Sequence, residues 1–556
     1  MKKILIYSIF SSIVLLLFWS CHKIDVKPKS LYTEDVFPQT VDQFQSVIGP
    51  VYTSLRGHYG LTYFFITEAT TEEAILPAYG GNWFDGGSYE NMHRHTWTKD
   101  HNWVGSSWAD ATGLVGLCNQ TMYILRNAPE GDVKNASLAE VRAIRAYAFW
   151  ELMDLFGGAP LDTLYPSPGL QAKASRTELF NFIESELKAI TPFLKTTVDA
   201  STYGKPTQYF AYSLLAKMYL NAEVYTGAKK LNECINACDM VINSGKFAIE
   251  PRNTYLQMFY PNNGPAMKEF IFAIPFDPAT PDGYFFPARY DLNRNLGMKY
   301  RYSGATPGNN TNPYPVVNLT TGNGLVNTKP SGPRATLSSY LNYFLEDAND
   351  IRLKQWLYGL QTWDNGSPLM VKTTKKGYDQ FYAGADGTAE YIYQLNIDTS
   401  IKLRQNVTLF DCGNDEIAWN QGARNIKFFP DAGSITRNQN NDVPVFRYSD
   451  IILMKAEAIL RGGTATGGQT ALSLVNQIRA NRSTSAAWTS IDLEQLYKER
   501  CREMVWECQH RTDMIRFGKF ENIYGFKTNT DTYRRIFPIP TSALNTNNKL
   551  EQNPGY

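Results

Sequence analysis

Apolar residues recur at three- and four-residue steps towards both ends of the chain. Between positions 141 and 155, Val141, Ile144, Ala148, Leu152 and Leu155 share one face, which is the spacing of an amphipathic helix. A Gly-Gly-Ala-Pro run directly after this stretch predicts its end. The same periodicity predicts helices over 177–190, 207–224, 229–243, 449–460, 470–480 and 493–515. Because successive amphipathic helices joined by short loops stack on one another, we predict a mostly α fold in which tetratricopeptide-like helix pairs, with degenerate repeats, form a superhelical scaffold.

The pattern changes in the middle of the chain. Eleven of the 28 prolines lie between positions 261 and 333, together with Gly- and Asn-rich runs. Such a segment favours loops over regular helix, and 389–397 and 426–429 are predicted strands. We therefore expect a long loop-rich section with short strands to decorate the helical scaffold, an arrangement that commonly presents a binding surface.

The first 20 residues have the pattern of a signal peptide. Lys2 and Lys3 precede an uncharged run over 4–18, which is shorter than the roughly 20 apolar residues that span a bilayer. The following LFWSC sequence resembles the lipobox of bacterial lipoproteins, which implies that Cys21 carries a diacylglycerol anchor to the membrane. Phe18 and Trp19 are bulkier than the usual lipobox residues, and the alternative is an ordinary secretory peptide with an incidental cysteine.

The charge balance and the motif content exclude several classes of function. Without Lys2 and Lys3 the chain carries 52 basic and 53 acidic residues, and such a balance argues against a nucleic-acid partner. The sequence contains no HExxH, GxSxG or P-loop motif and no GxGxxG that opens a helix. We therefore expect no cofactor and no catalysis, although sequence alone leaves a pair of hydrolytic carboxylates open.

Seven cysteines in an exported chain raise the question of disulfides. Cys501 and Cys508 lie two turns apart on one predicted helical stripe, roughly 10 Å, which is too far to bridge. Cys234 and Cys238 fall on the apolar face of another predicted helix. We expect buried, unpaired thiols.

Residues 79–108 form the most unusual local sequence, with four of the eleven tryptophans. Pairs of glycines at 80–81 and 86–87 permit tight turns, which favour exposure of Trp83 and Tyr89 between them. Aromatic rings complement the face of a sugar ring, and a few fixed polar groups complete such a site. The candidate polar groups are Asn82, Asp85 and Arg94. The alternative for these rings is a small aromatic core, which we predict for Trp97 and Trp108.

A second candidate surface lies in the proline-rich section. Its candidate contact residues are Tyr284, Tyr290, Tyr300 and Tyr302, interspersed with Arg289, Asn293 and Arg301. Aromatic packing beneath a loop is the alternative for each ring.

Three of the six histidines, His93, His95 and His101, lie close together in the sequence. A zinc site would need a further ligand and a second shell of hydrogen bonds from the fold. The simpler hypothesis is that they are hydrogen-bonding histidines in a structured loop, and we predict no metal.

Five segments then resemble, in order, the SusD/RagB family of outer-membrane nutrient-binding lipoproteins of Bacteroidota. They are RAIRAYAFWELMDLFGGAPL (142–161), GKPTQYFAYSLLAKMYLNAEVYTG (204–227), RYSDIILMKAEAIL (447–460), ERCREMVWECQHRTDMIRFGKF (499–520) and the closing FPIPTSALNTNNKLEQNPGY (537–556). The GGNWFDGG segment is similar to the RGGDW-DGG form of many members, with Tyr79 in place of the arginine and Asn82 in place of the aspartate. Because members with different ligands share that segment, it could instead be structural or face a transporter.

The resemblance implies a cell-surface lipoprotein in the outer membrane that binds oligosaccharide and delivers it to a SusC-type TonB-dependent transporter. Peptide binding for the same kind of transporter, a surface polysaccharide hydrolase and a purely structural lid stay open as alternatives. The expected organisation is a signal peptide (1–20), a lipidated tether (21–40), an N-terminal helical section (41–260), a loop-rich ligand-facing section (261–445) and C-terminal helices with a tail that packs back on the scaffold (446–556).

Overall fold

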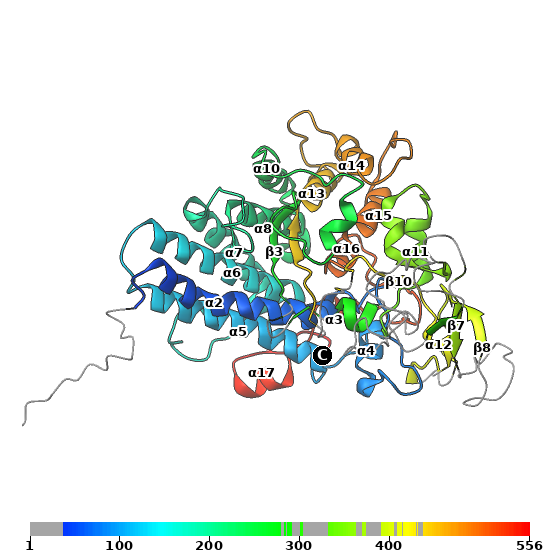
Figure 1. Ribbon diagram of the computed structural model, residues 1–556. Helices are drawn as coiled ribbons and strands as arrows, with labels where there is room; N and C mark the ends of the chain where they lie inside the picture. The colour runs from blue at the N-terminus through cyan, green and yellow to red at the C-terminus, as the bar shows by residue number, and fades with distance from the viewer. Residues whose placement is uncertain are drawn as a thin grey trace, which may run out of the picture.

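Stacked helices form the scaffold of the computed structural model, as the periodicity predicts. The structure describes residues 37–277, 279, 283–284, 286–291, 301–303, 332–362, 368, 370–373, 391–404, 409–413, 415–429, 431 and 438–556. The stack begins with α2 (Val41–Gly57), α5 (Asn102–Leu125) and α6 (Asp132–Phe156), which lie side by side at one end of the molecule (Figure 1). It continues through α7 (Arg176–Ile190), α8 (Gln208–Leu220) and α10 (Leu231–Ile242).

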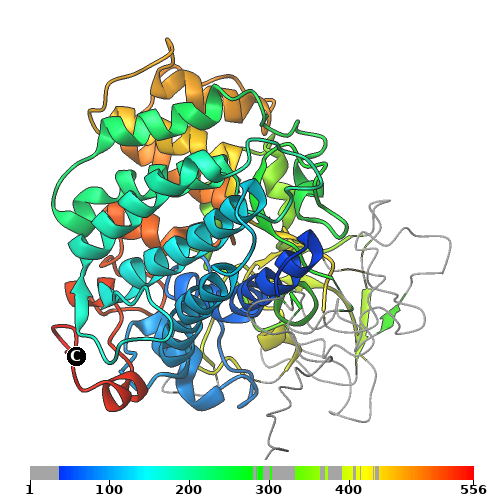
Figure 2. The ribbon, with the colours of Figure 1, turned by 90° about the vertical axis from the view of Figure 1, so that its left-hand side faces the viewer.

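The stack then continues with helices from a distant part of the chain. α13 (Tyr448–Leu460) packs directly against α10, and α14 (Ala471–Ala480) and α15 (Leu493–Met504) pack against α13. Figure 2 shows these helices following the N-terminal ones in one succession. The mostly α, tetratricopeptide-like architecture is therefore confirmed, with a long excursion of the chain between α10 and α13.

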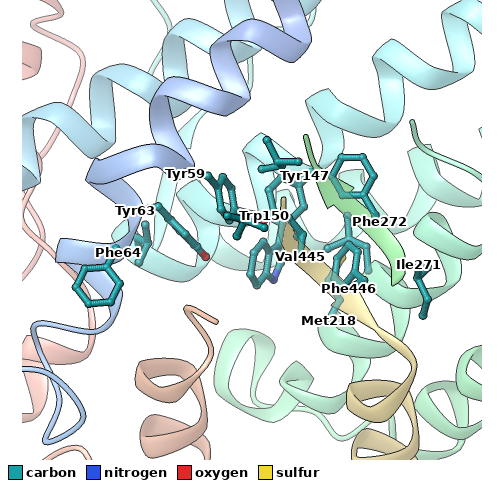
Figure 3. Packing of buried hydrophobic residues seen from close by; sticks show 14 of the residues in the cluster. Tyr59, Tyr63, Phe64, Tyr147, Trp150, Met218, Ile271, Phe272, Val445 and Phe446 are labelled. Carbon is teal, nitrogen blue, oxygen red and sulfur yellow. The ribbon is translucent and has the colours of Figure 1, made fainter. Parts of the chain in front are cut away.

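A two-stranded stem marks where that excursion leaves and rejoins the scaffold. β3 (Phe270–Ile274) pairs antiparallel with β11 (Val443–Arg447), which runs straight into α13. Ile271 and Phe272 of one strand and Val445 and Phe446 of the other belong to the same buried cluster as rings from α6 (Figure 3). The apolar strand pair thus anchors the loop-rich section in the main core.

The excursion itself contains short elements, most of which gather on one side of the molecule (Figures 1 and 2). The short helix η4 (Tyr255–Phe259) lies before the stem, and the helical elements of the excursion are η5 (Pro287–Asp291), α11 (Ser338–Leu345), η6 (Ile351–Gln355) and α12 (Glu416–Trp419). Its strands are β4 (Arg301–Ser303), β7 (Met370–Thr373) and β8 (Tyr391–Gln394) in one sheet, β5 (Trp356–Leu357) with β10 (Arg424–Asn425), and β6 (Gly359–Leu360) with β9 (Asn396–Ile397).

The remaining elements connect or close the scaffold. They are η1 (His58–Thr62), α3 (Tyr63–Thr67), η2 (Asp85–Gly87), α4 (Ser88–Arg94), β1 (Gly158–Pro160) with β2 (Lys173–Ser175), η3 (Thr191–Phe193), α9 (Ala222–Thr226), α16 (His510–Arg516), η8 (Thr532–Arg535) and α17 (Thr541–Thr546). The tail after α17 lies against the end of α6, where the Asn553 side chain donates hydrogen bonds to the carbonyls of Phe156 and Phe537.

A network of buried charges joins the loop-rich section to the C-terminal helices. Arg447 contacts Glu269, Glu503 and Glu507 at N···O distances of 2.7, 3.0 and 2.7 Å. Arg482 contacts the same Glu269 and Glu503, so each buried charge has opposite charges beside it. Burial alone would raise the pKa of Glu503. The positive charges of Arg482 and the arginines beside it outweigh burial and hold that pKa well below its usual range.

Several expectations about elements need correction. The predicted helix over 493–515 is two helices, because Trp506 and Cys508 take left-handed backbone angles between them. The Trp506 amide is bound by the buried Glu73 carboxylate, a tertiary contact that outweighs the helical periodicity. The segment 426–429 is not a strand, whereas 389–397 does contain β8 and β9.

The described cysteines are unpaired thiols, as predicted, but the predicted helical stripe shared by Cys501 and Cys508 is wrong. Cys508 lies beyond the end of α15 and does not share a helical stripe with Cys501. The six cysteines in the described part of the chain are all free, and five of them are buried. Among the described helices, we find none whose length and hydropathy would let it cross a bilayer.

Candidate ligand-binding site

The glycines at 80 and 81 allow a tight turn that is held by one distant carboxylate. Gly80 and Gly81 have φ of +61° and +82°, angles that residues with a side chain rarely adopt. Their amides donate to the two carboxylate oxygens of Asp411, each at 2.8 Å, and the Gly413 amide donates to the same carboxylate at 2.7 Å. Asp411 is buried, so these hydrogen bonds form a fixed cradle beneath the turn.

The residues on either side of the turn fix its direction. Tyr79 is fully buried and stacks on Trp419, with ring centroids 4.2 Å apart and an interplanar angle of 13°. The Asn82 side chain donates to the Tyr79 carbonyl at 3.0 Å and closes the turn. Tyr79 is therefore a packing residue, and the chain becomes more exposed from Asn82 onwards.

Trp83 and Asp85 follow this turn in strained backbone conformations. Trp83 has φ of +64° and Asp85 has φ of +44°, which costs about 1 kcal/mol or more at each non-glycine residue. Asp85 is exposed and Trp83 is half-buried. Strain of this kind persists only where the surroundings hold it, and it is concentrated at binding and catalytic sites.

The two candidate aromatic surfaces meet at Trp83. The Trp83 ring lies 6.4 Å from Tyr89 of α4 and 5.2 Å from Tyr290 of η5, measured between centroids. The guanidinium of Arg289 lies 5.2 Å from the Trp83 ring centroid and 5.4 Å from that of Tyr290. We call Trp83, Tyr89, Arg289 and Tyr290 the Trp83 cluster.

A buried ion pair fixes η5, and with it Arg289 and Tyr290. Asp291 contacts Arg334 at 2.5 Å, and both side chains are fully buried. The Arg334 guanidinium lies 3.2 Å from the ring centroid of Trp506. The backbone amide of Arg334 donates to the Tyr290 carbonyl at 3.1 Å. η5 is thus tied to the turn between α15 and α16.

Three of the predicted contact residues are buried, which corrects the expectation that they offer a ring to the ligand. Tyr89, Tyr284 and Tyr290 are 4%, 4% and 3% exposed. Tyr284 packs against Phe428 in the core, whereas Tyr89 and Tyr290 lie directly behind Trp83 and support it. Burial, the neighbouring Tyr290 hydroxyl and the Asp85 carboxylate raise the pKa of Tyr89 well above its usual value.

The remaining candidates differ in how far the structure places them. Asn82 and Asp85 are exposed, but Arg94 is engaged elsewhere, with its guanidinium bonded to Glu90 at 2.9 Å and to the Phe526 carbonyl at 3.0 Å. Tyr302 lies in β4, opposite Val371 of β7. Cys21 and Tyr300 lie outside the described residues.

The two nearby tryptophans lie in the core as predicted, and the three histidines form hydrogen bonds as predicted, although His93 lies in α4 and not in a loop. Trp97 and Trp108 are core residues at 1% and 6% exposure. His93 accepts from the Phe526 amide, His95 bonds to the Thr70 carbonyl and His101 bonds to the Ser88 carbonyl, so each ring has a hydrogen-bonding role. The described residues contain no group of three or more histidines, cysteines or carboxylates placed to hold a metal ion.

Sequence reasoning missed two residues of the site. Asp411 is 330 positions from Gly81, and no local signal connects the two. Arg289 was noted only as one of several polar residues among tyrosines, because nothing in the sequence shows that it lies over Trp83. A half-exposed indole with a guanidinium beside it suits a polar ring such as a sugar.

Comparisons with known proteins agree on the fold and the family. Residues 213–556 match the model described as the SusD family, and residues 24–220 match one described as starch-binding, associating with the outer membrane. The starch-binding protein SusD of Bacteroides thetaiotaomicron is 26% identical over 75% of this chain and 72% of its own length. The SusD-like protein P25 of Formosa agariphila is 23% identical, over 97% of both chains.

Solved structures share the architecture across most of the chain. A laminarin-binding SusD-like protein superposes with a TM-score of 0.67 at 19% identity, covering 93% of this chain and all of the other. Surface glycan-binding protein A from Bacteroides thetaiotaomicron, in complex with laminarihexaose, has a TM-score of 0.60 at 16% identity over 92% and 99% of the two chains.

Proposed function

Because this chain belongs to the SusD family, we propose that it binds an oligosaccharide at the Trp83 cluster and delivers it, chemically unchanged, to a SusC-type TonB-dependent transporter. The observation that carries the proposal is a half-buried tryptophan held in a strained turn. The glycines, the Asp411 cradle and the rings behind Trp83 all serve to fix that side chain at the surface. A fixed aromatic platform binds sugar rings at a low cost in side-chain entropy.

The relatives support a glycan as the ligand class. The names of one relative and two structural neighbours state binding of starch, laminarin and laminarihexaose respectively. Members of this family bind rather than transform their ligands, which supports a role without catalysis.

We place the protein at the outer surface of the outer membrane, anchored through lipid on Cys21. The support is the lipobox-like sequence and the family description of association with the outer membrane. Mass spectrometry of the mature N-terminus tests the anchor: a diacylglyceryl cysteine is expected, and an unmodified Cys21 would contradict it. Co-purification of the full chain with a TonB-dependent transporter tests the partner.

Binding to a panel of oligosaccharides and peptides, measured by affinity electrophoresis and calorimetry, tests the ligand class. We expect glycan binding that the substitution Trp83→Ala weakens about tenfold or more, which corresponds to roughly 1.4 kcal/mol. Trp488→Ala is the matched control, because Trp488 is also half-buried with an arginine, Arg479, 4.1 Å from its ring centroid. Trp488 lies between α14 and α15, outside the Trp83 cluster.

The other outcomes separate the alternatives. Binding of peptides with no glycan binding would favour peptide uptake, and release of reducing ends by the purified protein would establish a hydrolase. Co-purification with a transporter without affinity for any ligand would favour a structural lid.

A further inference from the structure

Resting on the proposed function, we infer that the glycan bound at the Trp83 cluster carries an acidic group, a uronate carboxylate or a sulfate ester, and that Arg289 recognises that group. This assigns a ligand class and a specificity-determining residue to the site.

The environment of Arg289 is the first observation. Its guanidinium lies beside two rings, Trp83 and Tyr290, at 5.2 and 5.4 Å from their centroids. Within the described part of the chain it forms no ion pair, although its side chain is half-buried. Two other arginines of these segments do have carboxylate partners: Arg94 is paired with Glu90, and Arg334 with Asp291.

Asp85 does not take the place of that missing partner. Its carboxylate acts on Tyr89, whose pKa it raises together with burial, and among the described residues it forms no ion pair with Arg289. Among the described residues, the Arg289 guanidinium contacts the two rings but has no carboxylate partner, so its charge is open to a ligand.

The position of Arg289 is fixed rather than adventitious. It is one of the five residues of η5, whose last residue, Asp291, is held by the fully buried Arg334. The Arg334 amide also bonds to the carbonyl of Tyr290, the residue next to Arg289. The backbone that carries the guanidinium is thus tied to the core.

The chemistry of the ligand follows from the cost of covering this charge. A neutral sugar placed on Trp83 would remove water from a guanidinium without supplying an opposite charge, which is unfavourable. A carboxylate or sulfate offers two oxygens to the planar N–H fork, and such charge-assisted hydrogen bonds are about twice as strong as neutral ones. An arginine stacked on an aromatic ring is a typical reader of such groups.

The test compares acidic oligosaccharides with neutralised counterparts on the full mature chain. One arm pairs uronate oligosaccharides with their carboxyl-reduced forms, and the other pairs sulfated oligosaccharides with their desulfated forms. We expect at least one acidic ligand to bind about tenfold to hundredfold more tightly than its neutral form. That preference should weaken at high salt, because screening acts on the charge and not on the stacking.

Variants assign the preference to Arg289. Arg289→Met should remove it, and Arg289→Lys should retain only part of it, because the charge stays while the planar fork is lost. Arg126→Met is the matched control, since Arg126 is an exposed arginine 3.5 Å from the ring centroid of Tyr123 at the end of α5. It should leave the preference unchanged.

The outcomes distinguish this inference from the proposed function. Glycan binding that depends on Trp83 but is equal for acidic and neutral forms overturns the inference and leaves the proposed function standing. An acidic preference that survives Arg289→Met also overturns it. Absence of binding to any glycan overturns both.

Discussion

Replacing the carboxylate that holds the Gly80–Gly81 turn should disorder the site without unfolding the protein. In Asp411→Asn, one of the two oxygens becomes an amide group that donates, and it would face an amide of the turn that also donates. The side chain is buried and receives hydrogen bonds of 2.7–2.8 Å from three backbone amides. Hydrogen bonds to a charged group contribute roughly 1.5–3 kcal/mol each, and they are not additive within one network.

The expected local loss in Asp411→Asn is therefore about 2–4 kcal/mol. Opening of the turn is a local event, because the stem of β3 and β11 and the helices of the scaffold do not depend on it. Trp83 follows directly after this turn, so the same variant should also weaken glycan binding.

Hydrogen exchange followed by mass spectrometry measures this effect directly. We expect peptides covering 78–87 to lose protection by roughly 30-fold or more, which is the equilibrium equivalent of 2 kcal/mol. Asp398→Asn is the control, because Asp398 is an exposed residue of the same section whose carboxylate, among the described residues, accepts only from Ser400. Unchanged exchange and unchanged glycan affinity in Asp411→Asn would refute the role given to the cradle.

Two further predictions concern stability. Burial alone would lower the pKa of His58, but the charge of Glu151 at 3.2 Å and a hydrogen bond to Asp110 raise it to about 9. A stabilisation of about 3 kcal/mol should therefore be present below pH 6.5 and be lost as the pH rises towards 9. Urea unfolding across this pH range measures the loss, which should be absent in His58→Gln. Arg334→Met leaves Asp291 buried without its partner and should lower the free energy of unfolding by about 3–5 kcal/mol, and a loss below about 1 kcal/mol would contradict the anchoring of η5.

The sequence predicts the helical scaffold because each helix buries one face and so repeats its pattern locally. α7, α10, α13 and α14 lie within one or two residues of their predicted bounds. The predicted helix over 493–515 fails at Trp506, where the buried Glu73 and Arg334, both distant in sequence, bind the amide and the ring. Local periodicity contains no information about such contacts.

The site could be predicted only in part for the same reason. The glycine pairs and the aromatic residues mark the turn at 80–87, and Trp83 is indeed half-buried there. Burial of Tyr89 and Tyr290 follows from the meeting of two segments about 200 positions apart, which composition cannot reveal. The distinction between a ring that contacts ligand and a ring that supports it is therefore tertiary.

A crystal structure of the mature chain with the glycan that binds most tightly tests the central claim most directly. The account predicts a sugar ring against Trp83, with the ligand's polar groups within hydrogen-bonding distance of residues around the turn at 80–87 and of η5. A glycan bound elsewhere on the molecule, with the Trp83 cluster empty, would contradict it.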